Sequence, residues 1–226
     1  GLALELQEVV ASMVFRFLLM FKCVVVSLLG LSFVALPTAA IAKNSTILIY
    51  GDSLSAAYGI SQQQGWATLL QKKLISQHYQ YDVINASISG ETSSGGLSRL
   101  PFALTKFKPN IIVLELGAND GLRGLSVKEM SKNLSAMIML SKEAKVKVLL
   151  VGMRIPPNYG PKYTTSFSQT YRQLSLQHKV SLVPFMLENI AAKPKLIQDD
   201  GLHPNVLGQP MILENIWQEL QVLLKK

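Results

Sequence analysis

Cysteine is almost absent: the 226 residues contain one, Cys23, near the start of the chain. The chain beyond residue 42 has no thiol, which excludes disulfides, cysteine nucleophiles and thiolate metal sites there. Charged residues are also few, at 16%, and bases outnumber acids, so the net charge is +8 at pH 7. A basic surface favours anionic partners such as phospholipid headgroups. Because dense Lys/Arg runs and nucleic-acid-binding motifs are missing, we expect no nucleic-acid partner.

Much of the 49% hydrophobic content is concentrated near the start. Arg16 and Lys22 precede an uncharged apolar run over residues 23–36, and a small-residue Ala-x-Ala stretch ends at Ala42. This is the layout of a secretory signal. The apolar core is shorter than the ~20 residues that span a bilayer, which argues against an uncleaved anchor. We expect residues 1–42 to comprise upstream residues and a signal over about 13–42, cleaved after Ala42 to give a periplasmic or secreted protein.

Strand-like and helix-like segments alternate through the rest of the chain. Apolar runs that favour β-structure cover residues 46–50, 81–86, 110–116, 146–153 and 180–184. Segments with helical character cover residues 66–77, 91–106, 127–144, 164–178 and 204–224. Such alternation indicates a parallel sheet covered by helices on both faces. We therefore expect one α/β domain over residues 43–226, with a flavodoxin-like three-layer α/β/α architecture and a five-stranded parallel sheet in the order 2-1-3-4-5.

A serine follows the first predicted strand directly, in Gly51-Asp52-Ser53. In parallel sheets, the loops at the carboxyl ends of the strands carry the ligand site, so Ser53 is placed to be a nucleophile. Taken alone, the stretch also suits an ordinary turn in which Asp or Ser caps the next helix.

A serine hydroxyl needs a base, and His203 is the best candidate because the other two histidines lie in polar stretches at helix ends. Asp200 precedes His203 by three residues, which lets its carboxylate reach Nδ1 and leaves Nε2 for Ser53. Asp199 is the alternative orienting acid. We therefore expect Ser53, His203 and Asp200 to be the catalytic residues.

Acyl transfer also needs hydrogen-bond donors aimed at the developing oxyanion, each worth roughly 3 kcal/mol. The backbone N–H groups of Ser53 and Gly90 and the side-chain amide of Asn119 are the candidates, because these residues follow the first three strands. Gly90 and Asn119 also suit ordinary turns. Asp52 and Asp120 are expected to brace loops rather than touch substrate.

Ile155, Pro156 and Tyr159 are expected to bind substrate as part of an apolar wall for an acyl chain. A carbohydrate acetyl esterase, the main alternative, would need a polar cleft. The complete set of catalytic candidates argues against a non-catalytic exported binding protein. A nucleotide-binding role is disfavoured because the first strand is not followed by a glycine-rich phosphate loop.

Four blocks of the chain occur in the order found in the GDSL, or SGNH, hydrolase family, which the chain therefore resembles. They are Gly51-Asp-Ser-Leu-Ser55, Asn85-Ala-Ser-Ile-Ser-Gly90, Gly117-Ala-Asn-Asp120 and Asp200-Gly-Leu-His-Pro204. The four residues that give the family its name fall on Ser53, Gly90, Asn119 and His203. Ala118 departs from the glycine found there in some members.

The resemblance implies an SGNH-type fold and a carboxylic-ester or thioester hydrolase of the lysophospholipase, acyl-CoA thioesterase or arylesterase type. It implies a Ser-His-Asp triad with no cofactor and no metal. The expected partners are an acyl ester, thioester or lysophospholipid substrate and, transiently, an anionic membrane surface. We expect the protein to act as a monomer.

Overall fold

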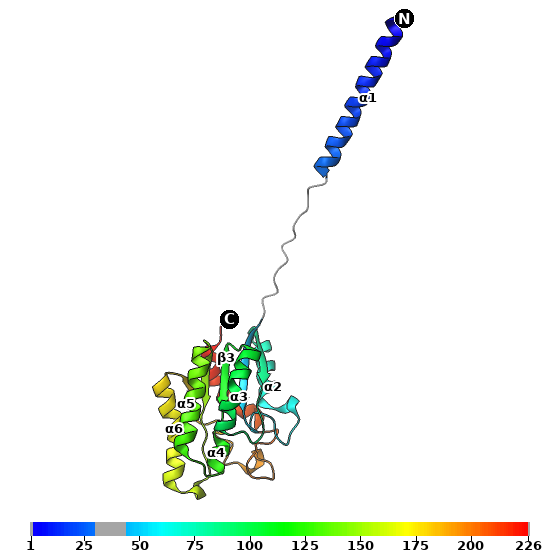
Figure 1. Cartoon of the computed structure of the whole chain (residues 1–226). Coiled ribbons are helices and arrows are strands. Elements are labelled where there is room, and N and C mark those ends of the chain that lie inside the picture. Colours follow the sequence, from blue (N-terminus) through cyan, green and yellow to red (C-terminus); the bar gives the residue numbers. More distant parts are fainter. Residues whose placement is uncertain (1, 30–43, 226) are drawn as a thin grey trace. The chain divides into compact units, whose positions relative to one another are not determined.

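The structure, a computed structural model, describes residues 2–29 and 44–225, and the chain divides into two compact units, residues 1–42 and 43–226. In the first unit, the described part is one helix, α1 (Leu2–Leu29) (Figure 1). None of the helices within these described ranges is long and apolar enough to cross a membrane. The expected cleavage point after Ala42 lies outside the described residues, so the signal sequence stays a prediction.

One five-stranded sheet forms the centre of the second unit. Its strands are β1 (Ser45–Gly51), β2 (Tyr81–Asn85), β3 (Ile111–Glu115), β4 (Lys147–Val151) and β5 (Ser181–Val183). All neighbouring strands run parallel, in the order β2-β1-β3-β4-β5, which confirms the predicted topology. The carboxyl ends of β1, β2 and β3 consequently meet at one edge, which is the lower edge of the sheet in Figure 1.

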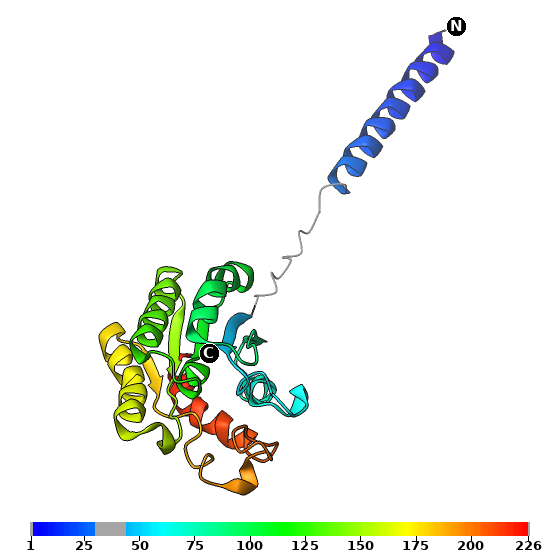
Figure 2. The same cartoon turned by 60° about the horizontal axis from the view of Figure 1, so that its bottom comes forward.

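Helices cover both faces of this sheet. They are α2 (Trp66–Ser76), α3 (Ser93–Phe107), α4 (Ala118–Leu122), α5 (Val127–Glu143), α6 (Pro161–His178) and α7 (Gln209–Leu220), with short 3₁₀ turns η1 (Gln62–Gln64), η2 (Pro157–Tyr159), η3 (Pro194–Leu196) and η4 (Gln221–Leu223). Helix α5 packs between α3 and α6, whereas α2 packs on α7. The two groups lie on opposite faces of the sheet (Figure 2), which gives the expected three layers.

Two elements differ from the sequence-based expectation. The closing helix, predicted over residues 204–224, begins at Gln209, because the preceding residues turn back onto the loop before them. There Pro204 bridges to Ile197, and the Asn205 N–H donates to the Leu196 carbonyl. Helix α4 was not predicted, since five residues are too few to show a helical period.

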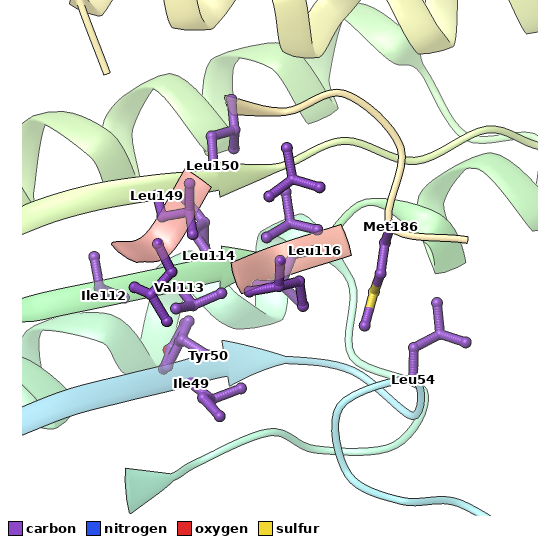
Figure 3. Close-up of a cluster of buried hydrophobic side chains, with 14 of the residues drawn as sticks. Ile49, Tyr50, Leu54, Ile112, Val113, Leu114, Leu116, Leu149, Leu150 and Met186 are labelled. Atoms are coloured by element: carbon purple, nitrogen blue, oxygen red, sulfur yellow. The ribbon is translucent and has the colours of Figure 1, made fainter. Parts of the chain in front are cut away.

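The hydrophobic core lies on the three central strands and continues beyond their carboxyl ends. Figure 3 shows side chains of β1, β3 and β4 side by side, with Leu54 and Met186 in the loops past the strands. All of the labelled side chains are buried. Fully burying an aliphatic side chain contributes about 1.5–3 kcal/mol, so the loops at this edge are held by apolar packing as well as by hydrogen bonds. The core thus gives the loops that follow the strands a fixed base.

The outer edge of β2 is covered by a side chain. The Val83 N–H donates to Gln71 Oε1 at 2.7 Å, and Gln71 Nε2 donates to the Tyr81 carbonyl at 3.0 Å. Gln71 belongs to α2, which packs beside β2. Its primary amide therefore satisfies one donor and one acceptor of a strand that has a neighbour only on its other side.

Candidate active site

The first loop at the carboxyl edge is a tight turn that begins at Gly51. A Cβ atom built at Gly51 would lie 2.4 Å from Glu115 Oε2 and 2.9 Å from the Glu115 carbonyl oxygen, so only glycine fits. Asp52 then accepts the Leu54 N–H on Oδ1 at 3.0 Å, and its carbonyl accepts the Ala56 N–H at 2.9 Å. These bonds close the turn and leave Ser53, which is half-buried, at the end of β1.

The structure brings Ser53, His203 and Asp200 together. His203 Nε2 lies 2.8 Å from Ser53 Oγ, and His203 Nδ1 lies 2.6 Å from Asp200 Oδ2. The other oxygen, Asp200 Oδ1, accepts the backbone N–H groups of Leu202 and His203 at 2.9 and 3.0 Å. Asp200, rather than the alternative Asp199, is therefore the acid against the imidazole.

Electrostatics keep Asp200 ionised. Burial raises the pKa of Asp200, but the N–H groups of His203 and Leu202 and the imidazole outweigh burial and bring that pKa to about 2. An ionised Asp200 accepts a hydrogen bond from a protonated Nδ1, so Nε2 is unprotonated and its lone pair faces Ser53. This is the tautomer that a base for the serine hydroxyl requires.

Tyr58 and Gln198 support His203. The ring of Tyr58 packs against that of His203, with 4.6 Å between the ring centroids. Gln198 donates from Nε2 to the Tyr58 and Pro204 carbonyls at 2.8 and 3.1 Å, and its N–H donates to the His203 carbonyl at 2.8 Å. Gln198 thereby joins the His203 loop to the turn that carries Ser53.

Asn119 lies in the first turn of α4, after Gly117, whose φ of 116° is a conformation that favours glycine. Its Nδ2 donates to Asp52 Oδ2 at 3.1 Å and to the Glu91 carbonyl at 3.0 Å. The structure therefore connects Asn119 with both the Ser53 turn and the loop that follows β2.

Gly90 lies in the loop that follows β2, with φ of 79°. That loop is tied to the Ser53 turn by two hydrogen bonds: the Gly51 N–H donates to Ser87 Oγ at 3.1 Å, and the Ile88 N–H donates to the Gly51 carbonyl at 3.0 Å. The Gly90 carbonyl accepts from Arg123 at 2.9 Å. The three predicted oxyanion-donor residues thus come from loops that are hydrogen-bonded to one another.

An ion pair that the sequence did not suggest braces the loop after β2. Arg99, on α3, donates to Glu91 Oε2 at 2.6 Å and to the Ala86 carbonyl at 2.8 Å. Its guanidinium carbon lies 3.9 Å from the centroid of the Tyr50 ring. Arg99 and Glu91 are only 23% and 13% exposed, so this contact is shielded from solvent. Arg99 therefore anchors the backbone on both sides of Gly90.

Two carboxyl groups lie completely buried beneath the Ser53 turn. They belong to Asp52 and to Glu115, the last residue of β3. Burial raises the pKa of Asp52 to about 6, although hydrogen bonds and the nearby His203 act in the opposite direction. Burial and the Asp52 charge hold the pKa of Glu115 well above its usual range. Sequence reasoning missed Glu115, and a lone acid in an otherwise apolar strand could have drawn attention to it.

A cavity of about 480 Å³ opens beside Ser53 and His203. Its wall is mostly apolar and includes Met153, Ile155, Pro156, Phe185, Leu187 and Ile197. Of the three residues predicted to bind substrate, Ile155 and Pro156 line this cavity and Tyr159 does not. The Tyr159 hydroxyl donates to the Leu122 carbonyl at 2.6 Å, and its ring stacks on Tyr163. Tyr159 thus braces the end of α4, and its contact with substrate stays a prediction.

Together these groups are suited to acyl transfer. Ser53, His203 and Asp200, predicted as nucleophile, base and orienting acid, lie with Asn119 at an apolar cavity of the size that small-molecule sites have. Within residues 2–29 and 44–225, His, Cys, Asp and Glu nowhere form a group of three or more that could hold a metal ion.

Comparison with known proteins gives consistent matches. Residues 49–210 match the model of the GDSL-like Lipase/Acylhydrolase family. Esterase TesA of Pseudomonas aeruginosa is 48% identical over 183 residues, which cover 81% of this chain and 91% of that protein. An arylesterase of Vibrio mimicus is 43% identical over 183 residues, covering 81% and 92%.

Thioesterase 1/protease 1/lysophospholipase L1 of Escherichia coli is 42% identical over 191 residues, which cover 84% of this chain and 90% of that protein. A crystal structure of TesA superposes with a TM-score of 0.78 at 48% identity, covering 80% of this chain and all of the other.

Proposed function

The chain belongs to the GDSL-like lipase/acylhydrolase family and is a serine esterase of the GDSL type, and we propose that it hydrolyses lipid acyl esters and thioesters through an acyl-enzyme on Ser53. The observation that carries this proposal is the contact of Ser53 with His203 and Asp200 at the end of an apolar cavity. Lysophospholipids and acyl thioesters are the substrate classes that we favour.

In the first half-reaction, Ser53 Oγ attacks the acyl carbonyl carbon while His203 Nε2 takes the hydroxyl proton. Asp200 orients the imidazole and stabilises its protonated form. The N–H groups of Ser53 and Gly90 and the Asn119 amide hold the oxyanion. His203 then returns the proton to the departing alcohol or thiol. Water repeats the sequence on the acyl-enzyme and releases the fatty acid.

The cavity supports an acyl-chain substrate rather than an acetylated sugar. A sugar would need several polar groups to replace its hydration, whereas the wall residues that lead away from Ser53 are chiefly apolar. The relatives named above are an esterase, an arylesterase and a thioesterase/lysophospholipase. Burial of the acyl chain would gain about 0.8 kcal/mol for each methylene that leaves water.

The setting of the reaction is part of the proposal. The signal-like sequence that ends at Ala42 points to export into the periplasm or medium, where the protein acts as a monomer. The net charge of +8 favours transient contact with an anionic membrane surface, from which a lysophospholipid can enter the cavity.

Hydrolysis of a p-nitrophenyl ester series from acetyl to palmitoyl, followed by lysophosphatidylcholine and palmitoyl-CoA, tests the proposal. We expect kcat/KM to rise with acyl length and Ser53→Ala to lower kcat about 10⁴-fold or more. Ser98→Ala, which removes an exposed hydroxyl on α3, is the matched control. Wild-type rates in Ser53→Ala would refute the nucleophile, and activity confined to acetyl esters would refute the lipid substrate.

A further inference from the structure

The carboxyl groups beneath the Ser53 turn have no part in the reaction described so far. Asp52 and Glu115 have no exposed surface. Burying carboxyl groups without a task is costly, because the ionised form loses its hydration. Both carboxyl groups lie between the nucleophile turn and the Asn119 amide.

Hydrogen bonds run from Glu115 through Asp52 to Asn119. Glu115 Oε2 accepts from Ser55 Oγ at 2.7 Å and from the Asp52 N–H at 3.2 Å. Asp52 Oδ1 accepts the Leu54 N–H, and Asp52 Oδ2 accepts Asn119 Nδ2 at 3.1 Å. Each carboxyl group is therefore fixed by the turn that carries the nucleophile.

The pair carries one negative charge at neutral pH, because two adjacent buried carboxyl groups cannot both ionise readily. Glu115 Oε1 accepts no hydrogen bond from any residue in 44–225, so a charge on Glu115 would be poorly paired. Asp52 has the better surroundings: Oδ1 accepts the Leu54 N–H, Oδ2 accepts the Asn119 amide, and His203 lies nearby. Asp52 consequently bears the charge and Glu115 the proton.

An ionised Asp52 determines which of its two orientations the side-chain amide of Asn119 adopts. A primary amide can rotate by 180° and exchange its NH₂ group for its carbonyl oxygen. The two groups that Asn119 Nδ2 meets, the Asp52 carboxylate and the Glu91 carbonyl, both accept and cannot donate. The rotated amide would place its carbonyl oxygen against the Asp52 carboxylate oxygen and the Glu91 carbonyl oxygen, where it could accept no hydrogen bond. The NH₂ group is thus kept in place by Asp52. Both of its hydrogens are engaged here, so the hydrogen that serves an oxyanion must first leave the Glu91 carbonyl.

We infer that Asp52 and Glu115 are positioning residues of the esterase: Glu115 holds Asp52, and Asp52 holds the Asn119 amide with its NH₂ group directed for the oxyanion. This inference rests on the proposed roles of Ser53 and Asn119. Both residues have no exposed surface, so both act through Asn119.

Asp52→Asn is the decisive perturbation, since it keeps the shape and removes the charge. Two donors face the two carboxylate oxygens of Asp52, namely the Leu54 N–H and the Asn119 amide, and an asparagine offers them one acceptor oxygen. Asn119 then loses its single orientation. We expect kcat for p-nitrophenyl butyrate to fall about 10- to 100-fold, with KM changed less than about threefold.

A double-mutant cycle shows whether the loss passes through Asn119. We expect Asn119→Ala to lower kcat about 30- to 100-fold, and Asp52→Asn to lower it by no more than about threefold further when Asn119 is already gone. A purely structural role would multiply the two losses. Multiplied losses, or an Asp52→Asn enzyme within twofold of wild type, would overturn the inference. Asp82→Asn, an exposed acid on β2, is the matched control.

Glu115 is tested by rescue with the conservative variant. Glutamine is neutral, like the protonated acid, and its amide oxygen can accept from Ser55 Oγ and the Asp52 N–H as Glu115 Oε2 does. We expect Glu115→Leu to lower kcat at least about tenfold and Glu115→Gln to recover most of that loss. A glutamine variant as impaired as the leucine variant would overturn the assigned proton. If Glu115→Leu does not fold, the Asp52 cycle still decides.

The two proposals fail in different ways. Wild-type turnover in Ser53→Ala would remove the acyl-enzyme mechanism, whatever the cycle gives. Multiplied losses in the cycle, combined with an inactive Ser53→Ala, would leave that mechanism standing and remove only the positioning role.

Discussion

Replacing Asp200 by asparagine should impair the enzyme more than replacing it by alanine. Asp200 Oδ1 accepts two backbone N–H groups and Oδ2 faces His203 Nδ1. An asparagine at this position can satisfy both N–H groups only by turning its oxygen to them and its NH₂ to the imidazole. Nδ1 must then accept, the ring proton moves to Nε2, and His203 can no longer take a proton from Ser53.

The size of the effect follows from the hydrogen bonds that compete. Each backbone N–H bond contributes about 1 kcal/mol, so the unproductive orientation of the asparagine is favoured by about 2 kcal/mol, or roughly 30-fold. Loss of the charge-assisted bond to the imidazole costs about another 1.5–3 kcal/mol in either variant. We therefore expect kcat to fall about 10²-fold in Asp200→Ala and about 10³-fold or more in Asp200→Asn.

Steady-state hydrolysis of p-nitrophenyl butyrate at pH 7.5 measures kcat and KM for both variants. Asp199→Asn removes the same charge one residue earlier and should leave kcat within about twofold. An Asp200→Asn enzyme that is more active than Asp200→Ala would refute the assigned tautomer. Equal losses in Asp199→Asn and Asp200→Asn would instead show that only the local charge matters.

Three further predictions concern the surroundings of the site. Gly51→Ala should lower the free energy of unfolding by at least about 2 kcal/mol in guanidinium titrations, because the added Cβ would lie 2.4 Å from Glu115 Oε2. Gly124→Ala has open space around it and should lower that free energy by only about 1 kcal/mol. Equal losses would contradict the steric argument. Arg99→Met should lower kcat about tenfold, because the hydrogen bonds to Glu91 and to the Ala86 carbonyl are lost. Arg172→Met, on the surface of α6, is the control and should leave kcat unchanged. Equal kcat values for the two variants would refute the bracing role of Arg99. The pKa of Asp52 is raised from 3.8 to about 6 in the folded state, so Asp52 contributes stability that is present below pH 3.8 and lost as the pH rises through 6. The melting temperature of Asp52→Asn relative to wild type should therefore increase from pH 4 to pH 7. A constant difference would show that Asp52 ionises normally.

The sequence predicted the sheet well because each strand is a short apolar run that ends in turn-forming residues. Buried parallel strands must be apolar on both faces, and this requirement leaves a clear trace at β3 and β1. Ser53, Asp200 and His203 were identifiable for a related reason. Their chemistry needs particular residue types at a particular place or spacing: Ser53 follows β1, and Asp200 precedes His203 by three residues. The structure places all three in contact.

Features that depend on distant parts of the chain were not predictable from local pattern. Tyr159 lies near the cavity-lining Ile155 and Pro156 in sequence, yet its hydroxyl is taken by the Leu122 carbonyl, which only the fold brings near. The closing helix was placed too early because Pro204 suits a helix start, whereas here it pairs with Ile197. The Asp52–Glu115 contact joins residues more than 60 positions apart.

The primary amide of Gln71 has a consequence for the behaviour of the protein in concentrated solution. An edge strand with free N–H and C=O groups is a template on which another molecule can add a strand. Gln71 occupies one donor and one acceptor on the free side of β2, where an incoming chain would have to bond. A single side chain from a neighbouring helix thereby discourages this sheet from growing from molecule to molecule, and no disulfide, proline or bulge is needed for that protection.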